Sequence, residues 1–199
     1  MVQRAVASGS TVLELGCGAG RLTRPLVALG YDVVAVDESP EMLAQVSGAE
    51  TVLGDVFDLR LEKLFDAVLA ASHFINTPDE ERRAALLGAC RRHVRPGGVV
   101  LVERYEPDWA ASPTPSESRL GPLDVVFQPL ERSGSGFRGR VTYRMGAAEW
   151  IQEFSAAALD DDKLAREAKA QGLHLEGWLD DKRTWGRLSP IRPSPVPTG

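Results

Sequence analysis

A glycine-rich run near the start of the chain has the residue types of a cofactor-binding loop. Residues 12–21 read VLELGCGAGR, so three glycines alternate with other residues directly after an apolar stretch. Glycine is needed where a strand turns sharply into a helix and a ligand approaches the main chain closely. The free N–H groups at the start of the helix then face that ligand. The run therefore predicts a nucleotide-type cofactor site.

The spacing of the glycines separates two kinds of cofactor. The dinucleotide fingerprint is G-x-G-x-x-G, which would require a third glycine at Arg21. Here the third glycine is Gly20, and the carboxylate of Glu14 stands two positions before the first. A carboxylate suits a cationic ligand better than a pyrophosphate. The loop thus disfavours a nicotinamide-dependent dehydrogenase, which stays open as an alternative.

The same run resembles the first motif of the class I S-adenosylmethionine-dependent methyltransferases, E-x-G-x-G-x-G after a strand. Four further segments match that family in order and spacing, namely residues 33–37, 54–55, 65–71 and 95–101. The resemblance is strong over residues 11–106 and continues more loosely to about 189. It implies S-adenosylmethionine as the cofactor.

The resemblance also assigns cofactor contacts to the ends of the expected strands. Glu14 would bind the ammonium at the methionine end, and Asp37 would accept hydrogen bonds from both ribose hydroxyls. Asp55 matches the acid that accepts from the adenine amino group. The full set is Glu14, Gly16, Cys17, Gly18, Gly20, Asp37, Glu38, Met42, Asp55, Val56, Ala70 and Ala71. The acids also have a purely structural interpretation, as capping or turn-forming residues.

Chemistry is expected at the residues that follow the fourth strand, where the transferred methyl group should point. Residues 70–76 read AASHFIN, which lacks the Asn/Asp-Pro-Pro-aromatic motif of DNA and protein amide methyltransferases and the Pro-Cys nucleophile of cytosine-5 enzymes. His73 is the candidate general base, because its pKa lies near working pH. A core or helix-start histidine is an equally good interpretation. His93 and His174 are expected to be surface or sheet residues.

Aromatic residues in the second half are candidates for an acceptor site. They are Tyr105, Trp109, Tyr143, Trp150, Trp178 and Trp185, and each is also compatible with core packing. Tyr105 and Trp109 follow the carboxyl end of the fifth strand, where ligands bind in such sheets. Tyr143 is the third residue assigned to the acceptor. No cluster of Asp, Glu, His or Cys has the spacing of a metal site, so none is predicted.

Alternating strands and helices must position these residues, and they predict a doubly wound, Rossmann-like α/β fold with a mostly parallel sheet. Strands are expected at 11–15, 32–37, 51–53, 67–71 and 99–105, with helices ending near 29, starting at 40, and covering 77–93 and 160–171. Thr77, with Pro78 in the first turn, is expected to open the third helix as a capping box. Ala84, Leu87 and Cys90 are expected on its inner face.

The pattern changes after the fifth strand. Residues 107–122 are expected to form a loop, and 124–131 with 138–145 an inserted β-hairpin, followed by a third strand at 149–156. The last two strands, 173–179 and 184–188, form the predicted antiparallel C-terminal pair. We expect one domain over 1–189 and a disordered tail over 190–199. Only ten residues precede the first strand, so segment 107–156 is expected to cover the site.

Composition narrows the class of protein. A chain of 199 residues suffices for one domain with a sizeable core. A formal net charge of −5 argues against nucleic acid as a partner, and no signal peptide or membrane-length apolar run is present in the sequence. Cys17 and Cys90 make no disulfide framework and are expected to be buried. A cytoplasmic protein is therefore predicted.

The sequence thus predicts transfer of a methyl group from S-adenosylmethionine to an oxygen or nitrogen atom of a small organic acceptor. Two alternatives stay open, an RNA or protein methyltransferase and a cofactor-binding, non-catalytic partner subunit. The sequence names neither the acceptor, nor the methylated atom, nor the oligomeric state.

Overall fold

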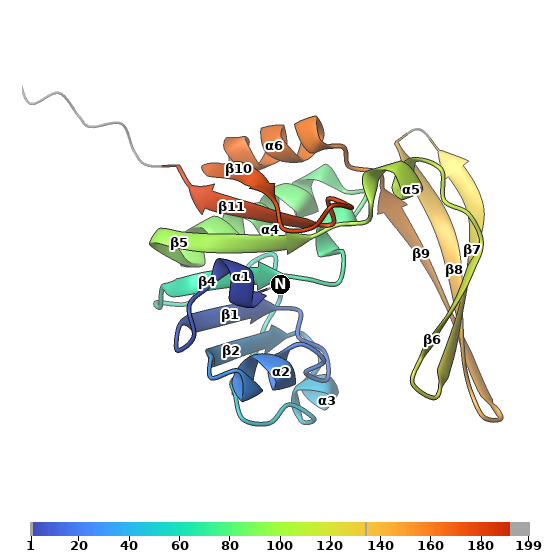
Figure 1. The fold of residues 1–199 in the computed structure, drawn as a ribbon, viewed down its shortest axis with the longest axis horizontal. Coiled ribbons are helices and arrows are strands. Elements are labelled where there is room, and N and C mark those ends of the chain that lie inside the picture. Colours follow the sequence, from blue (N-terminus) through green and yellow to red (C-terminus); the bar gives the residue numbers. More distant parts are fainter. Residues whose placement is uncertain (1, 134, 192–199) are drawn as a thin grey trace, which may run out of the picture.

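The chain forms two β-sheets in the computed structural model, which describes residues 2–133 and 135–191 (Figure 1). The larger sheet has seven strands in the order β10-β11-β5-β4-β1-β2-β3, and the smaller has four in the order β6-β7-β8-β9. The large sheet confirms the predicted α/β fold, because β1 to β5 are parallel and β10 and β11 form an antiparallel pair beside β5. No helix in the described ranges is long and apolar enough to span a membrane.

The strands of the large sheet begin and end within about two residues of their predicted bounds, except that β5 begins at Val94 and not at 99. They are β1 (Thr11–Leu15), β2 (Asp32–Asp37), β3 (Glu50–Leu53), β4 (Phe65–Ala70), β5 (Val94–Glu103), β10 (Leu173–Trp178) and β11 (Trp185–Pro190). From β1 the chain winds outward to β2 and β3 on one side and continues to β4 and β5 on the other. Such a switch between β1 and β4 creates a crevice at the carboxyl ends of the strands, where ligands bind in open α/β sheets.

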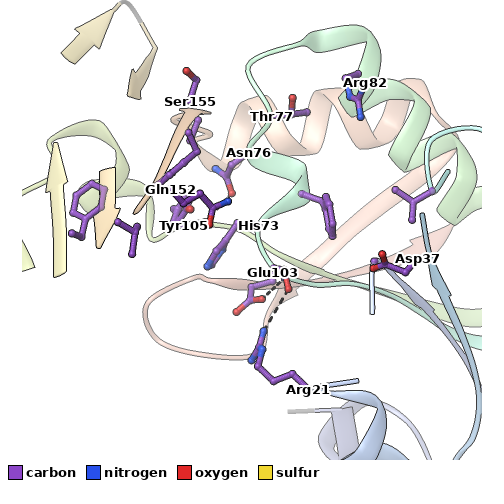
Figure 2. Close-up of a pocket in the computed structure, with 18 of the residues that line it drawn as sticks. Arg21, Asp37, His73, Asn76, Thr77, Arg82, Glu103, Tyr105, Gln152 and Ser155 are labelled. Atoms are coloured by element: carbon purple, nitrogen blue, oxygen red, sulfur yellow. Dashed lines mark hydrogen bonds between the residues drawn. The ribbon is translucent and has the colours of Figure 1, made fainter. Parts of the chain in front are cut away.

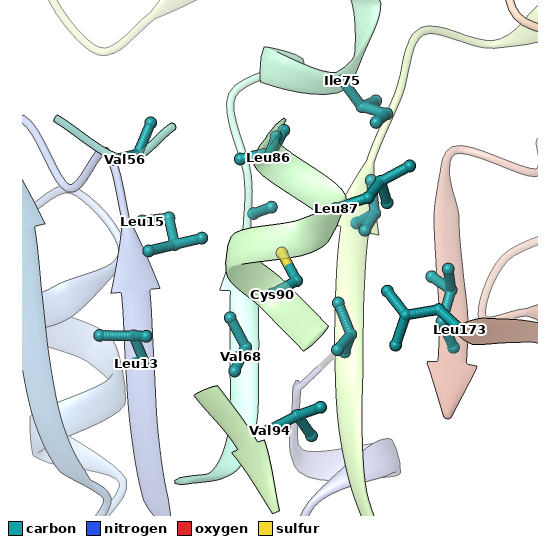
Figure 3. Close-up of a cluster of buried hydrophobic side chains, with 14 of the residues drawn as sticks. Leu13, Leu15, Val56, Val68, Ile75, Leu86, Leu87, Cys90, Val94 and Leu173 are labelled. Atoms are coloured by element: carbon teal, nitrogen blue, oxygen red, sulfur yellow. The ribbon is translucent and has the colours of Figure 1, made fainter. Parts of the chain in front are cut away.

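Helices cover both faces of the large sheet. They are α1 (Val2–Ala5), α2 (Thr23–Ala28), α3 (Pro40–Leu43), the 3-10 turn η1 (Phe74–Asn76), α4 (Glu80–His93) and α6 (Asp161–Ala170). On one face Leu13 and Val68 pack against Leu87 and Cys90 of α4 (Figure 3). On the other face residues of α1 and α2 pack against β1 and β2. The predicted burial of Cys17 and Cys90 is confirmed, whereas Ala84 is only partly buried.

The start of α4 differs from its prediction. Asp79, not Thr77, caps the helix, and its carboxylate accepts hydrogen bonds from the N–H groups of Glu81 (2.9 Å) and Arg82 (3.2 Å). Thr77 precedes a proline, and the proline ring disfavours helical backbone at that position. The carbonyl of Thr77 instead accepts a hydrogen bond from the buried Arg83 (2.6 Å). The capping-box prediction was therefore wrong by two residues.

The expectation that His93 is a surface or sheet residue was wrong, because the side chain is buried. Only 1% of its surface is exposed at the end of α4. Its Nε2 accepts a hydrogen bond from the N–H of Leu61 (2.9 Å), and its Nδ1 lies 2.8 Å from the carbonyl of Ala89. Both ring nitrogens are thus satisfied, which is what allows a polar side chain into the interior. His174, as predicted, is an exposed residue of β10.

The small sheet contains the predicted hairpin and third strand. Its strands are β6 (Ser116–Leu120), β7 (Leu123–Ser133), β8 (Gly136–Met145) and β9 (Ala148–Ala157). The loop expected over 107–122 was wrong, because that segment holds α5 (Pro107–Ala111) and β6. All five residues of β6 are exposed, so the strand has no apolar alternation to reveal it. Of the predicted tail, residues 192–199 lie outside the described residues, and Pro190 ends β11.

A buried arginine fixes the small sheet to the carboxyl edge of the large one. Arg104 follows β5 and is fully buried. Its guanidinium donates to the carbonyls of Leu159 (2.8 Å) and Arg183 (2.9 Å), forms an ion pair with Asp161, and lies 3.8 Å from the ring centre of Trp178. The end of β5 is thereby tied to the segment that leaves β9. The charge tolerates burial because each side of the guanidinium has a partner.

Candidate functional site

A cavity of about 1030 Å³ lies between the carboxyl edge of the large sheet and the inner face of the small one. Its lining runs from the glycine loop and the ends of β2 and β3, past the residues after β4 and β5, to all four strands of the small sheet (Figure 2). Sites for a single drug-sized ligand usually measure about 300–1,000 Å³. The cavity therefore lies at the upper end of that range.

The glycine loop presents open main chain to this cavity. Gly16 has φ +72°, and a Cβ there would lie 2.1 Å from the ring of Phe74, which packs directly against it. Gly18 has φ +54°, and a Cβ there would meet nothing within 4 Å. The first glycine is thus required by packing inside the protein. At the second the space beside Cα is open, while its N–H donates to the carboxylate of Asp37.

Asp37, at the end of β2, is held by the backbone on both sides. Its Oδ2 accepts a hydrogen bond from the N–H of Gly18 (2.7 Å), and its Oδ1 accepts from the N–H of Ser39 (3.0 Å). A carboxylate has about four lone-pair positions, so each oxygen retains one for a ligand. The side chain lines the cavity. Asp37 can therefore accept two further hydrogen bonds from a rigid position.

Glu14 lies behind the glycine loop, outside the cavity lining. It is 2% exposed, and its Oε2 accepts a hydrogen bond from the hydroxyl of Thr23 (2.6 Å). Burial raises the pKa of this carboxyl to about 7, although the hydrogen bond from Thr23 opposes the shift. A cationic group that came near would favour the ionised form. Glu14 is thus suited to respond to a ligand that carries a positive charge.

The loop after β3 supplies a second acid and a flat surface. Asp55 accepts a hydrogen bond through Oδ1 from the N–H of Phe57 (2.9 Å), which fixes the turn. The guanidinium of Arg82, on α4, lies 4.0 Å from the centre of the Phe57 ring. All three residues line the cavity. This wall combines a carboxylate with an aromatic face, which suits a planar, amino-bearing group.

His73 follows β4 on a strained turn. Ser72 and His73 both have left-handed backbone, with φ 58° and 60°. Consecutive non-glycine residues in this region are costly and are found mostly at functional sites. The turn is held because the N–H of Ser72 donates to Glu103 (2.7 Å) and the carbonyl of His73 accepts from the N–H of Asn76 (2.8 Å). The turn points the imidazole into the cavity (Figure 2).

The surroundings of His73 keep its ring neutral. The imidazole stacks on Tyr105, with 4.0 Å between ring centres. Its Nδ1 is buried and makes no hydrogen bond within the described part of the chain, and the residue lines the cavity. Burial lowers the pKa of His73, and the nearby carboxylate of Glu103 only partly offsets this. A neutral histidine can accept a proton, which is the first requirement of a general base.

Asn76 connects the histidine turn to both sheets. It is 2% exposed, its Nδ2 donates to the carbonyl of Ala157 at the end of β9 (2.8 Å), and its Oδ1 accepts from the N–H of Tyr105 (2.9 Å). Both polar groups of the amide are therefore used. The residue holds η1, the end of β5 and the end of β9 in one arrangement around the cavity.

An aromatic cluster forms the opposite wall. Tyr105 and Trp109 lie 5.3 Å apart between ring centres and pack on three phenylalanines of the small sheet, Phe127, Phe137 and Phe154. Tyr143 lines the cavity further along the same sheet. Burial raises the pKa of Tyr105 to about 12, so its hydroxyl stays protonated. Trp178 and Trp185 instead pack in the core of the large sheet.

The cavity brings together most of the residues proposed from the sequence. Its lining includes Gly16, Asp37, Glu38, Asp55, Val56, His73, Tyr105, Trp109 and Tyr143. Other proposed residues are not among the lining side chains, namely Glu14, Cys17, Gly18, Gly20, Met42, Ala70 and Ala71. Several residues that line the cavity were not predicted from the sequence, chiefly Arg21, Phe74, Asn76, Arg82, Glu103 and Gln152. Arg21 alone had a signal, because it directly follows the glycine run.

Comparison with known proteins agrees with this geometry. Residues 12–98 match the family described as "Methyltransferase domain". The structure of the CcbJ methyltransferase from Streptomyces caelestis superimposes with a TM-score of 0.78 at 19% identity, covering 96% of this chain and 87% of that one. Residues 12–98 therefore resemble a methyltransferase domain, and the fold is that of solved S-adenosylmethionine-dependent methyltransferases.

This chain is similar to curated relatives whose names give different acceptors. It is 29% identical over 191 residues to the "Cypemycin N-terminal methyltransferase" of a Streptomyces species, covering 92% of this chain and 69% of that protein. It is 31% identical over 121 residues to the "Ubiquinone biosynthesis O-methyltransferase" of Xylella fastidiosa, covering 55% of this chain. It spans only 47% of the length of that second relative.

Proposed function

We propose that this methyltransferase transfers a methyl group from S-adenosylmethionine to an oxygen or nitrogen atom of a small organic acceptor. The observation that carries the proposal is the position of His73. It stands in one cavity between the glycine loop with its acidic neighbours and an aromatic wall on a separate sheet. One ligand can therefore bind at each side of the histidine, with the reacting atoms between them.

The residues on the large sheet fit the cofactor. The open main chain at Gly18 suits close approach, and Asp37 offers free acceptor positions for ribose hydroxyls. Asp55 with the face of Phe57 suits an aminopurine, and buried Glu14 suits the ammonium at the methionine end. When bound, S-adenosylmethionine supplies an activated methyl group. The protein contributes by holding donor and acceptor in line, which is worth about 7–11 kcal/mol of the barrier.

His73 would take up the proton that the acceptor loses. A hydroxyl or protonated amine becomes a good nucleophile only when that proton leaves, and the neutral imidazole of His73, which lines the cavity, can accept it. The stack on Tyr105 fixes the ring, and the N–H of Asn76 fixes the turn by donating to the carbonyl of His73. General base catalysis of this kind contributes about 10²–10⁴-fold. Tyr105, Trp109 and Tyr143 would hold the apolar body of the acceptor.

The relatives support an acceptor atom of either element. One is named for methylation at an N-terminus and the other for O-methylation in ubiquinone biosynthesis. The cavity has one imidazole and a mostly aromatic acceptor wall, which suits both kinds of atom. The proposal is therefore made at the level of a small O- or N-acceptor.

Two measurements test the proposal. Calorimetry with S-adenosylmethionine, its demethylated product S-adenosylhomocysteine and NAD should show binding of the first two and none of NAD. Incubation with isotope-labelled S-adenosylmethionine and a small-molecule extract of the host should then transfer label to an extract component. Tight NAD binding with no response to S-adenosylmethionine would overturn the cofactor assignment. Cofactor binding without transfer to any extract component would favour a non-catalytic partner subunit.

A further inference from the structure

The two faces of the small sheet have opposite chemistry. Its outer face is covered by cross-strand ion pairs, including Arg140 with Glu153 (Nε–Oε1 2.9 Å) and Arg144 with Glu149 (Nε–Oε2 2.6 Å). Successive side chains of a strand point to opposite faces, so the neighbours of these charged residues point inward. The inner residues are aromatic, aliphatic or small, with the amide of Gln152 on β9 as the exception. The sheet thus separates a charged face toward solvent from an apolar face toward the cavity.

The apolar face continues beyond the part that the aromatic cluster fills. Tyr143 of β8 is paired with Trp150 of β9, and their rings stack with 5.6 Å between centres at 18°. Trp150 is 45% exposed, Met145 48% and Leu120 65%. Leu120 and Tyr143 both line the cavity. Together with Val125, these residues form what we call the distal shelf: Leu120, Val125, Tyr143, Met145 and Trp150.

The distance along β9 sets the size of a molecule that could use the shelf. Ala156 lines the cavity beside Ala157, whose carbonyl binds Asn76 of the histidine turn. Trp150 lies six residues earlier on the same strand. At about 3.4 Å per residue, the shelf begins about 20 Å from that end of the strand. Gln152 and Ser116 line the cavity between them and offer hydrogen bonds on the way, and Ser118 lies level with Val125 of the shelf.

We propose that the distal shelf binds an uncharged, aromatic or polycyclic extension of the acceptor while the reacting atom lies at His73. The inference rests on the proposed function and names the substrate class for the same cavity. We assign the acceptor as the occupant because the shelf is continuous with the cavity, since Leu120 and Tyr143 belong to both. None of the five shelf residues carries a charge, so the shelf offers no ion-pair partner and favours an uncharged group. An acceptor about 15–20 Å long, with a flat apolar end and polar substituents between, fits this surface.

The test uses a neutral planar probe, N-phenyl-1-naphthylamine, whose fluorescence rises in apolar sites. It is titrated into the full chain saturated with S-adenosylhomocysteine. We expect saturable binding that Trp150→Ala weakens about tenfold, because a stacking partner and its buried area are lost. Ile151→Ala is the matched control, since Ile151 is the next residue, 56% exposed, and points to the outer face. It should change probe affinity less than twofold.

Two further readouts separate the possible failures. Calorimetric affinity for S-adenosylhomocysteine should be the same in both variants and the parent, so a missing cofactor site would be recognised independently. Equal probe affinity in Trp150→Ala and the parent would refute the proposal that the distal shelf binds the acceptor. Sedimentation at several protein concentrations tests a different occupant. If the parent is a dimer and Trp150→Ala a monomer, the shelf is covered by a second copy of this chain and the proposal is wrong.

Discussion

The two sheets hold their functional side chains in different ways. On the large sheet Asp37 accepts backbone hydrogen bonds at 2.7 Å and 3.0 Å, so its position is set by the fold before any ligand arrives. On the small sheet Tyr143 has a hydroxyl contact of 3.5 Å with the amide of Gln152 and otherwise stacks on a half-exposed tryptophan. The first arrangement suits one invariant ligand. The second suits an apolar body whose shape is matched by packing.

His73 stands where the two arrangements meet. The turn that carries it is held to the large sheet through Glu103 and to the small sheet through Asn76. Changes on the large sheet should therefore affect the cofactor, changes on the small sheet the acceptor, and changes at the junction the chemical step. The predictions below test this separation.

The largest effect is expected at the junction. His73→Ala should lower turnover about 10²–10⁴-fold and leave affinity for S-adenosylmethionine nearly unchanged, because it removes only the proton acceptor. Burial lowers the pKa of His73 below the ordinary value for histidine, which is 6.5. The activity of the parent should therefore fall only when the pH drops below 6.5. His174→Ala, an exposed histidine on β10, is the control. A His73 variant that keeps most of its activity would mean catalysis by positioning alone.

The next effect is a pH dependence of stability that originates at Glu14. Its pKa rises from 4.5 to about 7 on folding, so the fold favours the protonated form. The free energy of unfolding without cofactor should be highest below pH 4.5 and fall as pH rises through 7, by about 3 kcal/mol at 1.36 kcal/mol per unit. Denaturant titrations from pH 4 to pH 8 measure this.

Two comparisons sharpen the Glu14 prediction. Glu14→Gln should lose that decline, whereas Glu62→Gln, at an exposed position outside the cavity, should retain it. Saturating S-adenosylhomocysteine, whose ammonium favours the ionised carboxylate, should flatten the profile of the parent. An unchanged pH profile in Glu14→Gln would show that the burial of this acid has no energetic consequence.

A smaller effect is expected at Asp37. Asp37→Ala should weaken cofactor binding about 10- to 150-fold, since hydrogen bonds to a charged group are worth about 1.5–3 kcal/mol. The variant also loses the bonds to Gly18 and Ser39, so circular dichroism must show that it is folded. Asp58→Ala, a surface aspartate paired with Arg60, provides the calorimetric control. Equal affinity in a folded Asp37 variant would refute the ribose assignment.

Sequence reasoning was strongest where structure depends on neighbouring residues. The glycine run, the start of α3 at Pro40, and His73 after β4 all follow from short patterns. The junction could not be predicted in this way. Asn76 binds residues 29 and 81 positions away, and Arg104 binds Leu159 across 55 positions. No local pattern of polarity indicates such partners, and the fully exposed β6 gave no periodic signal either.

Hydrogen exchange with and without S-adenosylhomocysteine tests the central claim most directly, namely that both sheets enclose one site. The account predicts slower exchange in the glycine loop and the end of β2, and also within residues 107–145, because that segment faces the same cavity. Protection confined to residues 14–73 would contradict it. The small sheet would then be remote from the bound cofactor, and its aromatic wall would be core rather than acceptor site.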